Sequence, residues 1–189
     1  MQLVVPSLDR LDAYADALRR GWSPDNVRLV EAPREELARI AADPAGFVAW
    51  LDDREARGGP ITLPDGSQVP RLPGYRRWMW DDDSDGGFCG SIAFRWQPGT
   101  EALPAHCLGH IGYAVPAWRR GRGYASRGLA LLLPEARKEG LRWVELTTDP
   151  DNVASQKVIE RNGGVFVKRF FKEAAYGPAV EALLWRIDL

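Results

Sequence analysis

Apolar residues change their spacing along the first third of the chain. The run LVV at 3–5 has the length and β-branched content of a short strand. From Leu8 the apolar positions recur every three or four residues as far as Gly21, which predicts a helix. Within 32–59, Asp43-Pro44 supplies an N-cap followed by a first-turn proline, and so predicts two short helices. We therefore expect a strand followed by helices.

Strand-like runs dominate the middle of the chain. Residues 61–70 carry β-branched side chains on both sides of a Pro-Asp-Gly turn and predict a small hairpin or extended loop. Three β-rich runs follow at 75–81, 88–96 and 110–115. Consecutive strands of this kind predict an antiparallel meander.

Helical spacing returns after the meander. Residues 123–138 follow a helical pattern, although Pro134 within it is expected to kink or interrupt the helix at a cost of about 3 kcal/mol. The remaining predicted elements are a strand at 143–148, a helix at 153–161 and a closing strand pair at 165–171 and 181–187. This order of strands and helices indicates an α/β (α+β) fold.

Length and charge limit the classes of function. A chain of 189 residues favours one domain. Its 25 Lys and Arg against 26 Asp and Glu give a formal net charge of -1, which argues against a nucleic-acid or membrane partner. The amino-terminal segment lacks a signal-peptide pattern, and Cys89 and Cys107 offer no disulfide framework. We expect a cytoplasmic protein.

An arginine- and glycine-rich stretch, RRGRGYASRGLA at 119–130, leads from the third meander strand into the next helix. A helix begins with unpaired backbone N–H groups and the positive end of its dipole, so it attracts anions. Glycines let phosphate oxygens approach the backbone, and guanidinium groups add charge-assisted hydrogen bonds. The stretch therefore predicts a site for a phosphorylated cofactor.

Two common phosphate-binding motifs do not fit this stretch. A dinucleotide fingerprint needs glycine where Ser126 stands and needs its glycines close after the strand, whereas residues 116–120 intervene. The P-loop motif is absent from the sequence. A nicotinamide-dependent enzyme is accordingly disfavoured.

Three motifs together resemble the GNAT acetyltransferase superfamily. Residues 120–125 are similar to its R/Q-x-x-G-x-G/A pyrophosphate loop, and residues 152–163 resemble its N-x-x-S-x-x-[LV]-x-E-[KR]-x-G segment. The strand HIGYAVP at 110–116 resembles the E-I-G-Y-x-[LV]-x-P run of the ribosomal-protein and amino-acid acetyltransferase branch. The resemblance spans roughly residues 88 to 189, and the predicted element order is that of the family.

The resemblance implies one domain over 1–189 with a mixed central sheet of about six or seven strands flanked by helices. The sheet is expected to be splayed between its fourth and fifth strands, with a bulge in the fourth. The implied parts are an acceptor-side β-α-α unit at 1–60, the meander with the pyrophosphate loop and helix at 75–140, and a β-α-β-β unit at 141–189.

The resemblance also implies acetyl-CoA as co-substrate, with no metal. Backbone N–H groups of the loop would hold its pyrophosphate, Val115 would pair with the pantetheine arm, and the Tyr113 N–H would donate to the acetyl carbonyl as an oxyanion donor. The residues expected to contact the cofactor are Tyr113, Val115, Arg120, Gly121, Arg122, Gly123, Tyr124, Ala125, Ser126, Asn152 and Ser155.

Acid and base residues depart from the family pattern. Ile159 stands where many members carry a tyrosine acid, so Ser155 is the best substitute, although a plain capping or packing hydroxyl is the alternative. His110 occupies the place of a glutamate in related strands and is a candidate base, against a structural histidine or a water relay. Glu145 is a weaker candidate. His106, Cys107 and His110 lack a fourth ligand for zinc.

These features predict an N-acetyltransferase that passes the acetyl group of acetyl-CoA directly to a primary amine of a small molecule or peptide in a ternary complex. The alternative is a GNAT module that binds acyl-CoA without turnover. No motif identifies the acceptor, and both a monomer and a homodimer are compatible with the sequence.

Overall fold

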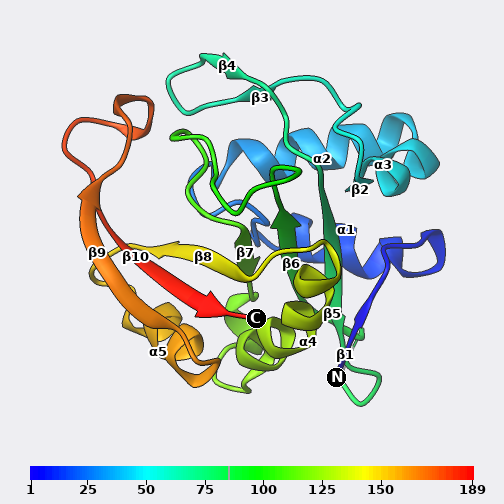
Figure 1. The fold of residues 1–189 in the computed structure, drawn as a ribbon. Coiled ribbons are helices and arrows are strands. Elements are labelled where there is room, and N and C mark those ends of the chain that lie inside the picture. The colour runs from blue at the N-terminus through cyan, green and yellow to red at the C-terminus, as the bar shows by residue number, and fades with distance from the viewer. Residues whose placement is uncertain (85) are drawn as a thin grey trace.

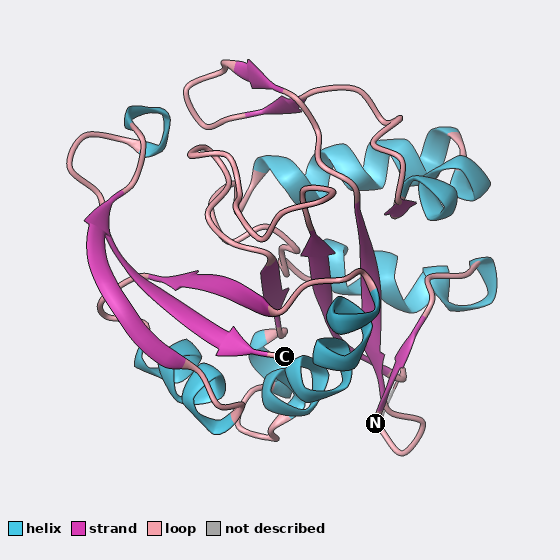
Figure 2. Ribbon diagram, viewed as in Figure 1, coloured by secondary structure: helices cyan, strands magenta, loops and turns pink. Residues whose placement is uncertain are grey.

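The computed structural model describes residues 1–84 and 86–189. Its long strands form two sheets that diverge from one another (Figure 1 and Figure 2). The first sheet contains, in spatial order, β1 (Gln2–Val4), β5 (Gly74–Trp80), β6 (Phe88–Arg95) and β7 (Ile111–Ala114), with β2 (Asp52–Asp53) also paired to β5. The second contains β8 (Trp143–Thr148), β10 (Glu181–Asp188) and β9 (Val165–Phe171).

The predicted helices and the small hairpin are all present. The helices are α1 (Leu11–Arg19), α2 (Glu31–Ala42), α3 (Pro44–Trp50), α4 (Tyr124–Lys138) and α5 (Val153–Arg161), and the hairpin pairs β3 (Ile61–Thr62) with β4 (Gln68–Val69). Single 3-10 turns lie at Leu8–Arg10, Ala117–Arg119 and Ala174–Tyr176. As predicted, α2 and α3 are divided at Asp43, whose carboxylate accepts the Gly46 N–H at 2.9 Å as an N-cap.

Helix α4 packs against both sheets (Figure 1). Its buried face, which includes Leu129 and Leu132, packs in one apolar cluster with side chains of β5 to β7 and of β8 and β10. Gly128 permits this close approach, because a Cβ there would lie 2.9 Å from the Met79 Cε. The burial of this shared apolar surface holds two diverging sheets on one core.

The opposite face of the first sheet carries an aromatic core. Tyr14 of α1 stacks on Trp78 of β5 with ring centroids 4.8 Å apart, and Trp22 and Phe88 meet Tyr14 edge-on. Offset-stacked and edge-to-face contacts are the favourable geometries for aromatic rings. These ring contacts hold α1, and Trp22 in the segment that leads into α2, against the first sheet.

Of the two effects expected of Pro134, a kink or an interruption of α4, the interruption does not occur. The helix runs through Pro134 to Lys138. The carbonyl four residues earlier belongs to Ala130, and both residues are exposed. Water can therefore bond to the carbonyl that loses its N–H partner, which reduces the cost of the proline.

The sheets part between β7 and β8, the fourth and fifth long strands along the chain, as predicted. The His110 N–H donates to the Glu145 carbonyl at 2.8 Å, and no strand ladder joins β7 to β8 in the described residues. We call the opening beyond this bond, between β7 and β8, the fork. The expected bulge in β7 is absent, since its pairing with β6 is in register. The register shifts instead in the β5–β6 pairing, where Cys89 of β6 is the extra residue, and in the β9–β10 pairing, where Val167 of β9 is.

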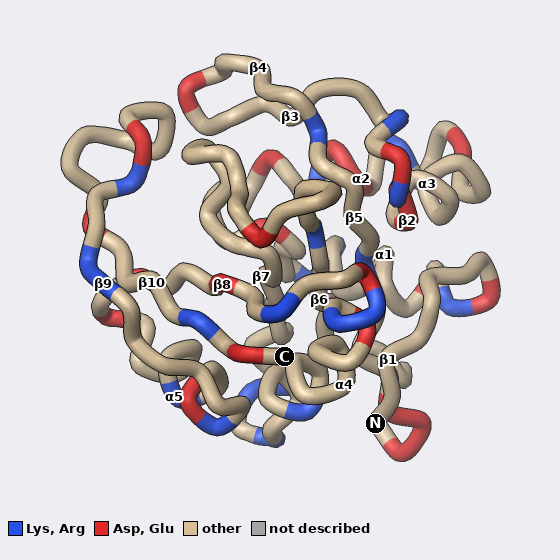
Figure 3. Tube along the Cα trace, viewed as in Figure 1, with Lys and Arg blue, Asp and Glu red and all other residues tan. Residues whose placement is uncertain are grey.

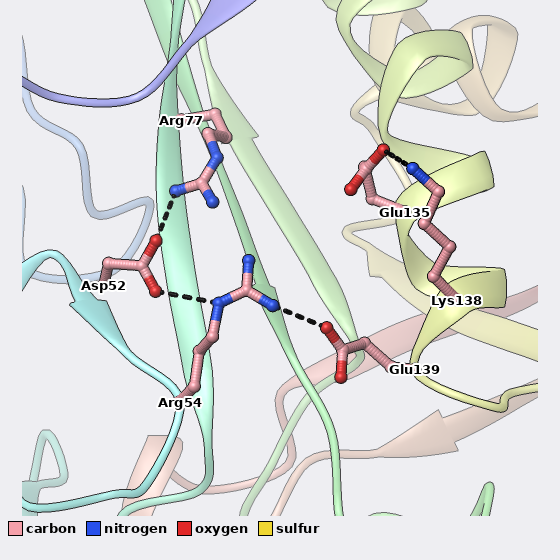
Figure 4. Close-up of polar contacts among 6 residues, drawn as sticks. All are labelled: Asp52, Arg54, Arg77, Glu135, Lys138 and Glu139. Atoms are coloured by element: carbon pink, nitrogen blue, oxygen red, sulfur yellow. Dashed lines mark hydrogen bonds and ion pairs between the residues drawn. The ribbon is translucent and has the colours of Figure 1, made fainter.

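Ion pairs connect the far end of α4 to the first sheet (Figure 4). Asp52 accepts a hydrogen bond from the Arg54 Nε at 3.0 Å and forms an ion pair with Arg77 at 2.9 Å, and Arg54 also donates to Glu139 at 2.7 Å. Both guanidinium groups lie over the Tyr75 ring. The chain of charges thus fixes β2 and β5 against the carboxyl end of α4.

A buried ionic cluster ties α1 and α2 to β5. The Arg76 guanidinium donates to Glu36 and to the Tyr14 hydroxyl, both at 2.8 Å, and that hydroxyl also bonds to Glu36. Glu36 is 5% exposed. Burial raises the pKa of Tyr14 well above its usual value, so the phenol remains a neutral donor.

Removal of Arg76 is expected to leave the Glu36 carboxylate buried without its cation. Arg76→Met is predicted to lower the free energy of unfolding by about 3 to 5 kcal/mol. The matched control is Lys138→Met, which breaks the exposed Glu135–Lys138 pair of Figure 4 and is expected to change stability by less than about 1 kcal/mol. Urea denaturation measures both, and equal stability losses would contradict the prediction.

Candidate active site

A cleft of about 1320 Å³ runs along the fork between the two sheets. It begins at the amino end of α4, passes the edges of β7 and β8, and opens between the α1–α2 connection and the β3–β4 hairpin. All of the predicted cofactor-binding residues line it except Arg122, which is exposed nearby, and among the predicted catalytic residues His110 does not line it. One cleft therefore brings most of the predicted site together.

The glycine loop (residues 120–123) precedes α4 at one end of the cleft. Gly121 and Gly123 both adopt φ +76°, a left-handed conformation that favours glycine. No side chain caps the amino end of α4, and its first turn contains no acidic residue. Lys and Arg positions gather around this end and along α5 (Figure 3). The first N–H groups of α4 are thus available to an anion.

Side chains at the start of α4 serve to fix it in place. Tyr124 is buried and its hydroxyl donates to Asp81 at 2.8 Å, so only its backbone faces the loop. The Asn162 amide donates to the Ser126 carbonyl at 3.2 Å and lies at the same distance from its hydroxyl. Asn162 thereby connects the end of α5 to the first turn of α4.

Two hydroxyl groups, one from β7 and one from α5, form a hydrogen bond in the wall of the cleft. The Tyr113 hydroxyl of β7 lies 2.7 Å from the Ser155 Oγ of α5. Asn152 caps α5 by accepting the Ser155 N–H at 3.1 Å. Burial raises the pKa of Tyr113 to about 12, an effect that its hydrogen bond with Ser155 opposes. Tyr113 therefore keeps its proton at neutral pH.

The backbone of Tyr113 faces the fork. The Arg95 N–H donates to the His110 carbonyl across β6 and β7, and hydrogen-bonded and non-bonded pairs alternate along an antiparallel ladder. Tyr113, opposite Ile92, falls in a non-bonded pair, so its N–H and C=O point away from β6. The Asn26 amide donates to that carbonyl at 3.3 Å, which leaves the N–H toward the cleft.

Val115 continues this edge beyond β7. Its carbonyl accepts from the Arg120 Nε at 3.4 Å, which folds the glycine loop back toward the strand. A Cβ at Gly90 of β6 would lie 3.2 Å from the Val115 Cα and 2.5 Å from the Ala114 carbonyl. The absence of a side chain at Gly90 lets the two strands approach here.

His110 lies outside the cleft in a fully buried position. Its Nδ1 accepts the Glu145 N–H at 2.9 Å, and its ring meets Trp143 edge-on. Burial, which disfavours the imidazolium ion, lowers the pKa of His110 to about 4. This position gives His110 a structural contact at the base of the fork and offers no support for a role as base.

The comparisons with known proteins identify the family. The model of the acetyltransferase (GNAT) domain matches residues 26–165. The chain belongs to the GNAT acetyltransferase family. No curated protein matches the chain.

Solved GNAT structures resemble the whole chain in fold. A ribosomal-protein-serine acetyltransferase structure from Vibrio cholerae aligns with a TM-score of 0.60 and 15% identity, covering 100% of this chain and 93% of that one. RimL, a ribosomal L7/L12 alpha-N-protein acetyltransferase solved with coenzyme A, gives 0.59 and 16%, covering 99% and 93%. The microcin C7 self-immunity acetyltransferase MccE, solved with acetyl-CoA and AMP, gives 0.58 and 11%, covering 99% and 91%.

Neither Ile159 nor Glu145 lines the cleft. Ile159, at the position of the family's tyrosine, is 1% exposed and belongs to the core beneath α5. Glu145 is outside the cleft and pairs with Arg186 of β10 at 2.9 Å.

In the part of the chain that the structure describes, no three His, Cys, Asp or Glu side chains converge on a metal position. No helix there has the length and apolar character to cross a bilayer.

The sequence analysis missed three residues of this site. Asn26 and Arg95 come from a loop and a strand that carry no motif, and Asn162 falls on an unspecified position of the segment 152–163. The alternation of β6 could have placed Arg95 on the face opposite its apolar residues. The Asn26 contact joins segments 87 positions apart and leaves no local signal.

The pKa of His110 predicts a pH dependence of stability. The unfolded chain binds a proton at this residue below about pH 6.5, whereas the folded protein resists protonation until about pH 4. Stability is therefore expected to fall by up to about 3 kcal/mol as the pH drops through this window, with no contribution above it.

Urea denaturation between pH 4 and 8 tests this expectation. His110→Gln is predicted to flatten the profile between about pH 6.5 and 4 relative to the parent protein. The control is His106→Gln, which removes the chain's other histidine and is expected to keep the parent slope. An unchanged slope in His110→Gln would contradict the assignment.

Proposed function

We propose that this protein is an acetyl-CoA-dependent N-acetyltransferase acting on a primary amine. The observation that carries the proposal is the fork, where the outward-facing edge of Tyr113 continues to a glycine loop and an uncapped helix end. An extended thioester arm can lie along such an edge while its diphosphate meets the first N–H groups of α4. Membership in the GNAT family and the cofactors of MccE and RimL support this arrangement.

Residues of the glycine loop and of the elements around it would each bind a different part of the cofactor. Backbone N–H groups of Gly121, Gly123, Ala125 and Ser126 would hold the pyrophosphate, with Arg120 and Arg122 adding charge. Val115 would pair with the pantetheine arm, and Asn152 would bond to it or hold a water. The Tyr113 N–H would donate to the acetyl carbonyl and stabilise the oxyanion that forms as the amine attacks.

Acetyl transfer to an amine requires two proton movements. The ammonium form has no lone pair and must lose a proton before it attacks the carbonyl carbon. Since His110 is buried outside the cleft, we assign this step to water in the cleft. The attack forms the C–N bond, collapse of the tetrahedral intermediate breaks the C–S bond, and the thiolate leaves.

The nitrogen of the tetrahedral intermediate carries one proton more than the amide product, and Ser155 would accept that proton as it donates its own to the leaving thiolate. The adjacent Tyr113 hydroxyl remains protonated and can bond to the serine as it donates. A thiol of pKa about 8.5 is a good leaving group, so a weak acid is sufficient. This hydroxyl pair takes the place of the family's tyrosine, whose position is the core residue Ile159.

The first test concerns the cofactor site. Gly121→Glu places a carboxylate at the proposed pyrophosphate position and is expected to weaken acetyl-CoA binding at least about tenfold in calorimetric titration. Gly140→Glu is the matched control, because Gly140 also has positive φ and open space around it, at the other end of α4. Both variants are expected to lose about 1 kcal/mol of stability. Equal affinities in the two variants would refute the loop assignment.

The second test separates turnover from mere binding. Acetyl-CoA is offered with amino acids, polyamines, aminoglycosides and peptides with free amino termini, and release of the coenzyme A thiol is measured. We expect acceptor-dependent release, whereas acetyl-CoA binding without release would favour the non-catalytic alternative. Ser155→Ala is expected to lower kcat about 10- to 100-fold with little change in acetyl-CoA affinity.

Tyr113→Phe serves as the companion to Ser155→Ala. If the two hydroxyl groups act as a unit, the double variant is expected to be no slower than the slower single variant. An unchanged kcat in Ser155→Ala would exclude it as the acid.

A further inference from the structure

Arg95 is a half-buried cation in the cleft without a counter-ion. Its side chain makes no hydrogen bond or ion pair with any residue in the ranges 1–84 and 86–189, and it lies at the carboxyl end of β6, facing the cleft. The other arginines on this side of the cleft have partners: Arg28 pairs with Glu35, Arg71 with Asp53, Arg76 with Glu36, and Arg39 lies over Trp50. A guanidinium group stays charged at every physiological pH, and withdrawing it from water without an anion is unfavourable.

The carboxylates of the same region are already occupied. Glu35, Glu36 and Asp53 hold the arginines just named, and Asp25 accepts backbone N–H groups of its own loop. In the described part of the chain, none of these carboxylates forms an ion pair or a hydrogen bond with Arg95. Within residues 1–84 and 86–189 no carboxylate pairs with Arg95, so its guanidinium is available to an anion on a molecule that enters the cleft.

Gly112 leaves room for this guanidinium beside the proposed reaction centre. A Cβ at Gly112 would lie 3.4 Å from the Arg95 Nη2, so the guanidinium lies over the bare backbone of β7. The next residue is Tyr113, whose N–H faces the fork. One strand residue advances about 3.3 Å, so an anion on Arg95 lies within a few bonds of the point where the acceptor amine attacks.

The proposed pyrophosphate site lies at the other end of β7. The glycine loop lies beyond Ala114, the last residue of β7, whereas Arg95 follows Phe94, the residue paired with Ile111 at the opposite end of β7. Figure 1 shows the two ends of β7. A diphosphate held at the amino end of α4 is therefore not the partner of Arg95. An anion bound to Arg95 would therefore lie on the acceptor side of the cleft.

We propose that Arg95 binds a carboxylate or similar oxyanion carried by the acceptor, a few bonds from the amine that receives the acetyl group. Such an acceptor is an amino acid, or a peptide with an acidic group close to its amino terminus. A planar guanidinium can bind a carboxylate through two parallel N–H···O bonds, which fix the orientation of the amine as well as its distance. This inference rests on the proposed acetyltransferase function and adds the class of substrate.

Matched acceptors test the proposal. Amino acids are compared with their carboxamides, and dipeptides with Asp in the second position with those carrying Asn, by thiol release from acetyl-CoA. The first comparison probes a free α-carboxylate and the second an acidic side chain in a peptide. In the parent protein we expect kcat/KM to favour the acid of at least one kind of pair by at least about tenfold.

Arg95→Met is expected to bring this acid-to-amide ratio to about one without changing acetyl-CoA affinity or thermal stability, since it removes an unpaired charge. Arg137→Met, an exposed residue of α4 outside the cleft, is the matched control and is expected to keep the parent ratio. Equal rates for acid and amide in the parent protein would overturn the proposal. A loss of the same factor for both in Arg95→Met would also overturn it.

A binding experiment separates this proposal from the proposed function. N-acetyl amino acids and their amides are titrated by calorimetry into protein saturated with coenzyme A. Preference for the acid that disappears in Arg95→Met supports the anion site even where no thiol release is found, in which case the acetyltransferase proposal alone fails. Thiol release without any preference for acids leaves that function standing and rejects the role of Arg95.

Discussion

The backbone bond between the His110 N–H and the Glu145 carbonyl is the point on which the site depends. The two sheets are linked at this bond, and beyond it β7 and β8 separate. The imidazole of His110 strengthens the junction by accepting the Glu145 N–H, which takes the place of a carbonyl in a ladder. Because the strands then diverge, the backbone of Tyr113 is left with no neighbouring strand on one side. An unpaired strand edge is a ready site for an extended ligand.

A divided sheet is stable only if something else holds its halves together. Helix α4 does so, because its apolar face packs against both sheets and its carboxyl end is tied to β2 and β5 by Arg54 and Asp52. Its amino end, fixed by Tyr124 on Asp81 and by Ser126 on Asn162, presents the glycine loop to the cleft. The same helix therefore supports the fork and carries, at its amino end, the N–H groups proposed to bind the pyrophosphate.

The sequence predicted the elements well where local chemistry determines them. The N-cap at Asp43 divides α2 from α3, and the motif at 120–125 marks the start of α4. The sequence is less informative where the outcome depends on the surroundings of a residue. The cost of Pro134 depends on whether its lost partner carbonyl is exposed, and the role of His110 depends on burial, which a position equivalent to a family glutamate does not reveal.

This difference explains why the cofactor half of the site is easier to predict than the acceptor half. The groups proposed to bind the cofactor are mainly backbone N–H groups, and their direction requires particular residue types, such as glycine at φ +76° in 120–123, so a short motif records them. The side chains proposed for the acceptor half are brought together by strand pairing and loop contacts, such as Arg95 over Gly112 and Asn26 on Tyr113. Such contacts impose no local pattern. Selectivity can therefore vary through single side chains while the motif and the fork remain unchanged.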